Sequence, residues 1–508
     1  AIDSLPLGSS YLKARLEDAP MPNLNRNAGF TSGKSTSPTT TYSIVDVDDE
    51  YSDLLANKNA NGEGSFNSLI EEFEFGSGQP LDLDPLSDTF TPPKYTGIVQ
   101  NHSKPYNTVQ IETTDINRGL DEAIFDPLVW RLNSGISDAD TSIPTTLPVA
   151  QIPDYVATFL HRPWYPNPSE VGGYAKVGDE IFWYTTFSDI DGIATFTGVK
   201  RGQLRTTAAA HDVAANTKDI QKPAITEWIY LDESATDLCK ALITGRLSDG
   251  RGLPAHWTAK ADERWINTAS FARYSTKLRL KFSNPGKTEC RDFYEKEILS
   301  LMGAVLVVDG RGQLNWTPRA RPTDESADVG SIVLDPSNCV TSNELTLKHI
   351  KTDIHPSVKI SYDYDSIETQ TFLQPVTYRD IESESHNKIV PGKKVKEFAF
   401  KGLHSGVHTG TQLLKLAATY GDDYFYEKQS FTIESYVNDI QLGTLVAVDF
   451  PDVVDDATGA ANSGPLKRTM LVVESRENRE TRTTTYTLSG SLYIQSTRQS
   501  SQKLHNLE

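Results

Sequence analysis

The two histidines of the stretch HSGVH have the spacing that comes closest to a chemical motif in this chain. His404 and His408 are four residues apart, which places two imidazoles on one face of a helix and is typical of zinc-binding helices. Gly406 separates them, Gly410 follows, and no neighbouring glutamate or third ligand completes a tetrahedral set. The pattern therefore predicts no metal site.

Several turn-like sequences resemble other ligand-binding motifs only in part. DGRG occurs at residues 249–252 and 309–312, but neither copy opens a helix after a strand or carries the Lys-Ser/Thr of a phosphate loop. DVDDE at residue 46 and SDIDG at residue 188 lack the later glutamate of a calcium loop. GxSxG, HExxH and a Cys–His neighbourhood are absent from the sequence. We therefore expect no catalytic residue and no cofactor.

Composition sets wider limits on function. The chain has 508 residues, too many for one compact core, and 49 Lys and Arg against 68 Asp and Glu give a net charge of −19. This acidity disfavours charge-driven binding to nucleic acid or to an anionic membrane. Carboxylate pairs of a glycosidase are set by distance in space, so the 68 acidic residues leave that alternative open.

The three cysteines and the N-terminus bear on the compartment. Cys239, Cys290 and Cys339 are about 50 residues apart with no CxxC pair, so we expect buried thiols and folding in a reducing cytoplasm. The N-terminal AIDSLPLG has no basic start followed by an apolar stretch, which favours a chain without a secretion signal.

Alternating apolar and polar residues predict strands along most of the chain. YTGIVQN and NTVQIETTDI flank the turn-forming HSKPYN, and two further strands flank an Asp-Gly turn between residues 172 and 199. AVLVVDGRGQLNW predicts a hairpin turned by Asp309 and Gly310, and LGTLVAVDF begins with a structural turn at Gly443. Residues 476–482 are charged and predict a hairpin tip between two strands.

Three segments have helical spacing. SATDLCKALITG has Ser234 as N-cap and Gly245 as stop, TECRDFYEKEILSLMG runs from Thr288 to Gly303, and TQLLKLAATYG predicts a short helix near the C-terminal third. The first forty residues are rich in Ser, Thr, Asn, Gly and Pro and predict an extended arm. The fold class is therefore mainly β with α+β parts, in several domains.

The stretch RGQLRTTAAAHD, residues 201–212, fits neither a strand nor a complete helix. Three consecutive alanines let such a connection lie flat on a neighbouring surface. We interpret it as a candidate subunit-contact loop, and a purely structural loop remains an equal alternative. The residues of that candidate loop are Arg201, Gly202, Thr206, Thr207, Ala208 and His211.

This stretch and the strands before it resemble the small inserted module of bacteriophage tail hub proteins, which form the baseplate or tail-tip hub of long-tailed phages. The family's GDEI.RYT strand and its L.GV.RG..GT.A..H segment match fourteen positions of this chain. They are Gly178, Asp179, Glu180, Ile181, Tyr184, Thr185, Gly198, Val199, Arg201, Gly202, Thr206, Thr207, Ala208 and His211. Arg205 departs from the pattern, which favours glycine there.

Weaker similarity extends from residue 95 to residue 490, with Thr444 in place of a usual aspartate. The resemblance implies tube-like β-barrel domains with a small inserted β module and a helix-containing middle region. We divide the chain into an N-terminal arm (1–40), a first hub β-domain (41–150), the inserted module (151–222), the middle region (223–345), a C-terminal β-barrel domain (346–495) and a tail (496–508).

The resemblance also implies a structural role rather than an enzymatic one. A hub of this family is a homotrimer at the virion tail tip that meets the distal tail or tail-tube ring, the tape-measure protein and tip fibres or spikes. DNA passes through the trimer without specific binding, which agrees with the acidic composition.

Two other classes of protein remain as alternatives. Seven Trp and 21 Tyr would suit a β-rich adhesin or carbohydrate-binding protein with aromatic stacking surfaces, although core packing also accounts for such rings. A tail-associated cell-wall hydrolase is the other, and the sequence has no stretch that we recognise as catalytic.

Overall fold

The computed structural model describes residues 5–7, 10–12, 16–18, 25–29, 34–35, 39–45, 69–72, 95–103, 108–114, 120–148, 172–214, 218, 221–246, 253–254, 257–259, 266–273, 278–308, 313–318, 332–340, 346–350, 353–421, 423–426, 428–438, 440–450, 454–455, 460–461, 468–478 and 481–491. Over these residues the chain is mainly β, with several separate sheets and few helices, as the sequence predicts. No described helix is both long and apolar enough to cross a membrane.

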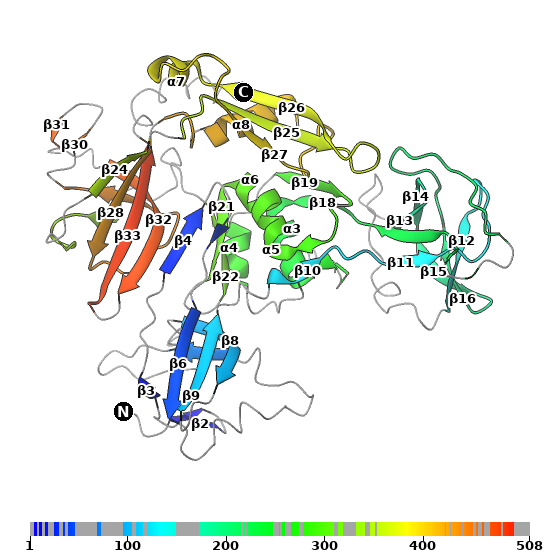
Figure 1. Cartoon of the computed structure of the whole chain (residues 1–508), viewed down its shortest axis with the longest axis horizontal. Helices are drawn as coiled ribbons and strands as arrows, with labels where there is room; N and C mark the ends of the chain where they lie inside the picture. The colour runs from blue at the N-terminus through cyan, green and yellow to red at the C-terminus, as the bar shows by residue number, and fades with distance from the viewer. Residues whose placement is uncertain are drawn as a thin grey trace.

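The sheets are strung out along an elongated molecule (Figure 1). A small β module lies at one end, and a large sheet from the C-terminal part of the chain lies at the other. A helical middle region connects them, with a three-stranded sheet on one side and an N-terminal sheet on the opposite side.

The small module consists of two sheets around one core. The four-stranded sheet has the order β11 (Val129–Arg131), β17 (Ala224–Trp228), β13 (Gly173–Val177) and β14 (Glu180–Tyr184). The three-stranded sheet has the order β12 (Ser142–Pro148), β16 (Ile193–Thr197) and β15 (Thr186–Ile190). The module therefore takes strands from outside the range 151–222, and the boundaries that we expected at residues 150 and 222 separate paired strands.

Apolar burial explains why this short stretch forms a module. Every residue of β14, Glu-Ile-Phe-Trp-Tyr, is buried, because one face of the strand meets the module core and the other meets an aromatic cluster. The predicted Asp-Gly turn is confirmed: Asp191 and Gly192 have φ of 54° and 78° and connect the paired residues Ile190 and Ile193.

The middle region packs short helices against two-stranded ladders. Its elements are β10 (Ala123–Ile124), β18 (Tyr230–Ser234), α3 (Ala235–Thr244), α4 (Thr268–Arg273), β19 (Arg279–Ser283), β20 (Thr288–Glu289), α5 (Cys290–Tyr294), η6 (Glu295–Leu299), α6 (Ser300–Met302), β21 (Ala304–Val308) and β22 (Leu314–Pro318). The predicted caps of α3 are confirmed: the Ser234 side chain accepts from the Asp237 amide, and Gly245 is left-handed with φ of 81°.

The second predicted helix differs from the structure at its start. Thr288 and Glu289 pair with β10 as a short strand, so the helix begins at Cys290. It then runs continuously through the π-helical turn η6 and ends before Gly303, which is left-handed with φ of 57°. The three cysteines are free and buried, as predicted.

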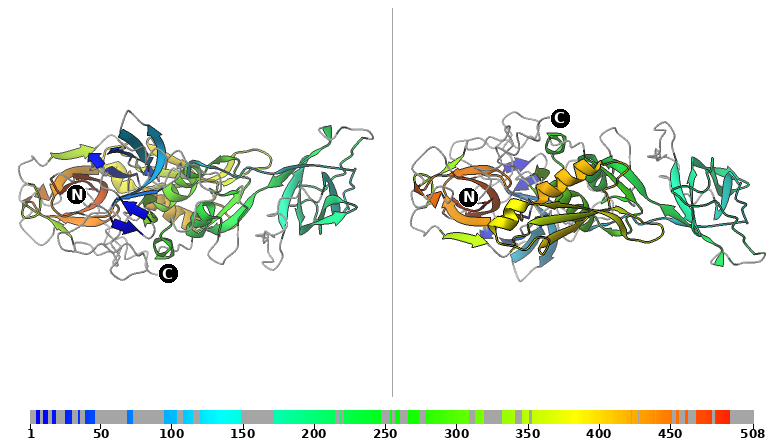
Figure 2. Two further views of the ribbon diagram at one scale, coloured as in Figure 1. Left: turned by 90° about the horizontal axis from the view of Figure 1, so that it is seen from below. Right: turned by 90° about the horizontal axis from the view of Figure 1, so that it is seen from above.

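The three-stranded sheet has the order β26 (Phe372–Arg379), β25 (Ser357–Tyr364) and β27 (Val395–Ala399). Helix α7 (Ile381–His386) follows β26, and α8 (Gly410–Gly421), the third predicted helix, covers one face of the sheet (Figure 2). Val358, Ile360 and Leu413 bury their side chains in the same core as the middle-region helices.

The large C-terminal sheet has a core of its own. Its strands run in the order β23 (Val333–Leu334), β29 (Leu445–Val448), β32 (Arg468–Asn478), β33 (Thr483–Ser491), β28 (Lys428–Ser435) and β24 (Thr346–Ile350), with β4 (Asn25–Gly29) and β5 (Lys34–Ser35) added at β32. Among the described strands no pairing joins β23 to β24, so the sheet does not close.

The β-barrel domain that the resemblance implies for residues 346–495 is therefore not a closed barrel in the described part of the chain. The apolar residues of β25 and α8 pack against the middle region, whereas those of β28, β29, β32 and β33 pack against one another. Two separate cores divide this range, and the strands of the first are unavailable to complete the second.

The N-terminal sheet contains the predicted hairpin of YTGIVQN and NTVQIETTDI. Its order is β3 (Leu16–Asp18), β6 (Thr39–Val45), β9 (Thr108–Thr114), β8 (Tyr95–Ser103) and β7 (Leu69–Glu72), while β1 (Leu5–Leu7) pairs with β2 (Ser10–Leu12) and β30 (Val454–Asp455) with β31 (Ala460–Ala461). The predicted arm thus contributes β3 to this sheet and β4 to the C-terminal sheet. The tail 496–508 lies outside the described residues.

Candidate functional site

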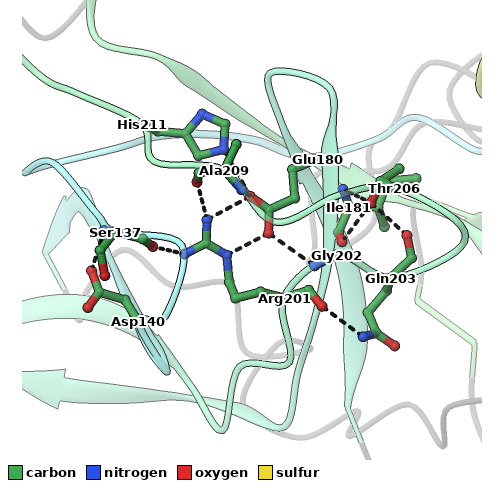
Figure 3. A network of polar contacts seen from close by, with 10 residues as sticks. All are labelled: Ser137, Asp140, Glu180, Ile181, Arg201, Gly202, Gln203, Thr206, Ala209 and His211. Atoms are coloured by element: carbon green, nitrogen blue, oxygen red, sulfur yellow. Dashed lines mark hydrogen bonds and ion pairs between the residues drawn. The ribbon is translucent and has the colours of Figure 1, made fainter.

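The stretch RGQLRTTAAAHD wraps around one buried carboxylate, that of Glu180 at the start of β14 (Figure 3). The Glu180 side chain is 1% exposed, and four residues make five polar contacts with it. Oε1 accepts from Arg201 Nε at 2.6 Å and from the Gly202 amide at 3.1 Å. Oε2 accepts from Arg201 Nη2 at 2.6 Å and the Ala209 amide at 3.1 Å, and His211 Nε2 lies 3.0 Å away.

Arg201 connects this carboxylate to the rest of the module. Its guanidinium is 7% exposed and meets Glu180 with two parallel hydrogen bonds, the geometry in which arginine binds carboxylates most strongly. The remaining donors reach backbone oxygens, Nη1 the carbonyl of Ser137 and Nη2 the carbonyl of Ala209 at 2.7 Å. Three segments far apart in the sequence are thereby held together, and we call this network the Glu180 clamp.

The protonation states of the clamp follow from its contacts. Burial by itself would raise the pKa of Glu180, but the hydrogen bonds from Arg201, the Ala209 amide, His211 and the Gly202 amide outweigh it and lower that pKa. The side chain is therefore an ionised carboxylate at neutral pH. Since an ionised carboxylate only accepts, Nε2 of His211 carries the proton that lies between the two groups.

Backbone geometry closes the loop beyond Gly202. Gly202 has φ of 59°, and a Cβ there would lie 2.9 Å from the Ala208 nitrogen. The next residues form a tight turn in which the Thr206 amide donates to the Gln203 carbonyl at 3.0 Å. The two central residues, Leu204 and Arg205, both have positive φ, 51° and 72°.

This turn explains the departure from the family pattern at Arg205. Arg205 occupies a left-handed position that glycine adopts at lower cost, which accounts for the glycine that the pattern favours there. Thr206 fixes the turn to β14, because its hydroxyl accepts from the Ile181 amide at 2.9 Å and donates to the Gln203 carbonyl at 2.7 Å. The turn is retained without the glycine.

The predicted subunit-contact residues divide into two groups. Arg201, Gly202, Thr206 and His211 are directed into the module and make the contacts above. Thr207 is exposed and Ala208 is half-buried, as expected for the part of the loop that faces outward. Any contact with another subunit would therefore use the 207–210 segment. The four inward-directed residues would fix the conformation of that segment.

The clamp is poorly suited to catalysis. Both oxygens of Glu180 are already occupied by hydrogen bonds, and the carboxylate has almost no solvent contact. No group of three or more His, Cys, Asp or Glu residues in the described ranges is arranged to hold a metal ion. Within those ranges the geometry is that of a structural lock.

The remaining predicted positions lie elsewhere. Asp309 and Gly310 fall outside the described residues, although the flanking strands pair from Val308 and Leu314. Gly443 has φ of 82° and lies in a turn before β29, where the Thr444 amide donates to the Gln441 carbonyl at 3.2 Å.

The two histidines of HSGVH have different surroundings in the structure. Nδ1 of His404 lies 3.4 Å from Oδ1 of Asp363, and His408 is 6% exposed beside β19. Burial lowers the pKa of both imidazoles.

Sequence reasoning did not single out Glu180, although the residue belongs to the matched pattern. A glutamate at the start of an otherwise apolar strand, EIFWY, is the signal that could have identified it, because a buried carboxylate requires partners. Ser137 carried no such signal.

No family model and no curated protein sequence matches the chain. Solved structures similar to it include three prophage tail proteins. The prophage MuSo2 43 kDa tail protein from Shewanella oneidensis is 9% identical, with a TM-score of 0.35 and 96% of this chain and 97% of that one covered. The tail protein from Neisseria meningitidis MC58 is 10% identical, with a TM-score of 0.35 and coverage of 95% and 94%. Prophage tail protein gp18 from Listeria monocytogenes EGD-e is 11% identical, with a TM-score of 0.31 and coverage of 81% and 96%. Similarity this low carries no argument about function.

Proposed function

We propose that the chain is a structural virion protein that forms the trimeric hub of a phage tail tip or baseplate. In this role it joins the hexameric tail tube or distal tail ring to the tip and frames the channel through which DNA is ejected. The protein is not an enzyme in this proposal. It folds in the cytoplasm of the host bacterium and resides at the distal end of the tail.

The observation that carries the proposal is that residues matching the hub-module pattern make the contacts that shape the module's loop. The hub-module pattern includes four residues of the Glu180 clamp, Glu180, Arg201, Gly202 and His211. It also includes Thr206, which fixes the adjacent turn, so each of these five residues makes a contact that shapes the loop. Gly178 and Gly198, also matched, have left-handed φ of 56° and 63°. The pattern thus coincides with residues that define a local structure, rather than with scattered surface positions.

Assembly as a trimer is supported by strand edges. In the described part of the C-terminal sheet, β23 and β24 each have a neighbour on one side. Open edges are normally covered or paired, and closed rotational symmetry pairs them without building a filament. The partners expected for the trimer are the tail-tube or distal tail ring, the tape-measure protein and tip fibres or spikes.

The charge of the chain suits a DNA channel without specific binding. A net charge of −19 allows an acidic lumen, and basic residues there would retain the genome through phosphate contacts. Tight, salt-sensitive binding of duplex DNA by the assembled protein would contradict this part of the proposal.

Two measurements test the proposal as a whole. Immunogold labelling of particles should place the chain at the distal end of the tail, whereas labelling of a bacterial surface would support the adhesin alternative. Light scattering should give about three times the chain mass of 56.2 kDa, alone or with the tail ring added. A monomer under both conditions would contradict the trimer, and release of soluble fragments from cell walls would support the hydrolase.

A further inference from the structure

The small module is joined to the middle region through a very short neck. β17 ends at Trp228 and β18 begins at Tyr230, so Ile229 alone separates a strand of the module from a strand of the body. Figure 1 shows the module standing clear of the body at this point. The Trp228 indole donates to Ser283 Oγ at 3.1 Å, and the Asn284 amide donates to the Ile229 carbonyl at 2.7 Å.

A cluster of aromatic side chains surrounds this neck. It contains residues of the module and of the body, namely Tyr174, Ile181, Trp183, Trp228 and Tyr230, and we call it the neck cluster. The ring centroids of Tyr174 and Trp183 are 5.0 Å apart, and those of Tyr174 and Tyr230 are 5.5 Å apart. Contact between rings from both sides of the neck couples the position of the module to that of the body.

Two further apolar side chains pack against the neck cluster, one from the module and one from the body. Leu204, from the module, stands on the turn that follows the Glu180 clamp. Its left-handed φ of 51° is unfavourable for a residue other than glycine, and the contacts of Thr206 with Ile181 and Gln203 hold the turn in that conformation. The contacts of Thr206 therefore keep Leu204 in a left-handed conformation in which it packs against the cluster.

Ile367, from the body, stands on the loop between β25 and β26. Asp365 organises that loop: its carboxylate accepts from the amides of Ile367, Glu368 and Thr369 at 3.0, 3.2 and 3.0 Å. A loop built in this way presents one apolar side chain in a fixed place, although Glu368 and Thr369 themselves are exposed.

We propose that the β25–β26 loop, residues 365–370, is a strap that closes over the neck cluster and fixes the orientation of the small module relative to the body. With the strap in place, Ile367 of the body and Leu204 of the module both pack against the cluster. Without it, only two short connections join the module to the body, Phe125–Leu128 between β10 and β11 and Ile229 between β17 and β18. The proposal rests on contacts within one chain and is independent of the proposed function.

The test is a distance measurement between the module and the body of the full chain. Spin labels on Ala139→Cys in the module and Lys415→Cys on α8 report the orientation by pulsed electron paramagnetic resonance, and both sites are exposed. The three native cysteines are buried, so labelling is confined to the introduced sites. The parent should give one narrow distance distribution.

Ile367→Ser and, separately, Asp365→Ala should broaden that distribution and add longer or shorter distances. Ile190→Ser is the matched control, because Ile190 is 45% exposed in the same module and does not belong to the neck cluster. It should leave the distribution narrow.

A narrow distribution in both strap variants, or a parent distribution as broad as theirs, would overturn the proposal. Near-UV circular dichroism checks that the variants keep their folded aromatic core. Loss of that signal in both variants would show that the loop belongs to the core of the module rather than forming a strap, and would also overturn it.

Discussion

Replacing Glu180 by glutamine isolates the contribution of the clamp with little change of volume. The amide keeps one oxygen, whereas the carboxylate offers two that together receive five contacts. The other end of the amide is an NH₂ group that would face donors on Arg201, the Ala209 amide and His211. The guanidinium of Arg201, 7% exposed, would lose its counter-charge.

The magnitude follows from the burial of both partners. Removing one member of a buried ion pair costs about 3–5 kcal/mol, because the other charge is left without compensation. Each 1.4 kcal/mol is a factor of ten in an equilibrium constant, so the local opening equilibrium should rise by roughly a hundred- to a few-thousand-fold.

Hydrogen exchange of the segment 200–212, followed by mass spectrometry, measures this directly. A local readout is needed because a chain with several cores does not unfold in two states. Asp179→Asn is the matched control, since Asp179 is the exposed neighbour and its replacement removes the same charge. Exchange in the control should remain within about three-fold of the parent.

The reasoning would be refuted by an increase below ten-fold in 200–212, or by an equal increase across all sheets of the chain. The pH dependence gives an independent check. Because the pKa of Glu180 is lowered on folding, its contribution is present above the ordinary pKa of 4.5 and is lost as pH falls through the folded value. Acid should therefore accelerate exchange in the parent more than in Glu180→Gln.

Three further outcomes are expected. Arg205→Gly should stabilise the 203–206 turn by about 0.5–1 kcal/mol, because glycine adopts the φ of 72° at position 205 at lower cost than arginine. The Thr206 amide should then exchange more slowly, and faster exchange would contradict the turn assignment. Glu297→Gln should slow exchange across 290–302 at pH 8 but not at pH 4. Burial raises the pKa of Glu297 to about 7, although the Lys401 amide donates to its carboxylate, so the stability that Glu297 contributes is lost as pH rises from 4.5 to about 7. The glutamine variant should gain roughly 2–4 kcal/mol of stability at pH 8, and an equal effect at both pH values would contradict this reasoning. Lowering pH from 7 to 5 should accelerate hydrogen exchange of the segment 402–409, after correction for the intrinsic exchange rate. Burial lowers the pKa of His404 and His408, so the stability contributed by their neutral forms is lost as pH falls below 6.5. His408→Gln should reduce this pH response, and an unchanged response would assign it to other groups.

Features controlled by near neighbours in the chain were accessible from the sequence. Ser234 caps α3 through a group three residues away, Gly245 ends the same helix, and Asp191 with Gly192 turns a hairpin. Each depends on a conformational preference of a single residue type and on partners within four positions. Their locations could therefore be predicted without the fold.

Features controlled by burial from several segments were not accessible. The β-barrel domain at residues 346–495 was expected from the family resemblance, and neither that resemblance nor the strand patterns say which core a strand will join. Thr288 and Glu289 have helical neighbours but pair with β10, a partner more than 160 residues earlier.

The sequence by itself determined a mainly β chain, the Asp191–Gly192 turn and both ends of α3, because backbone preferences and hydrophobic alternation act over a few residues. Tertiary structure decided the Glu180 clamp. Its members come from residues 137, 180, 201–202 and 209–211, and only folding brings their charges and amides to one carboxylate. A buried charge is tolerable when such partners converge on it, and that convergence is set by three-dimensional packing rather than by spacing along the chain.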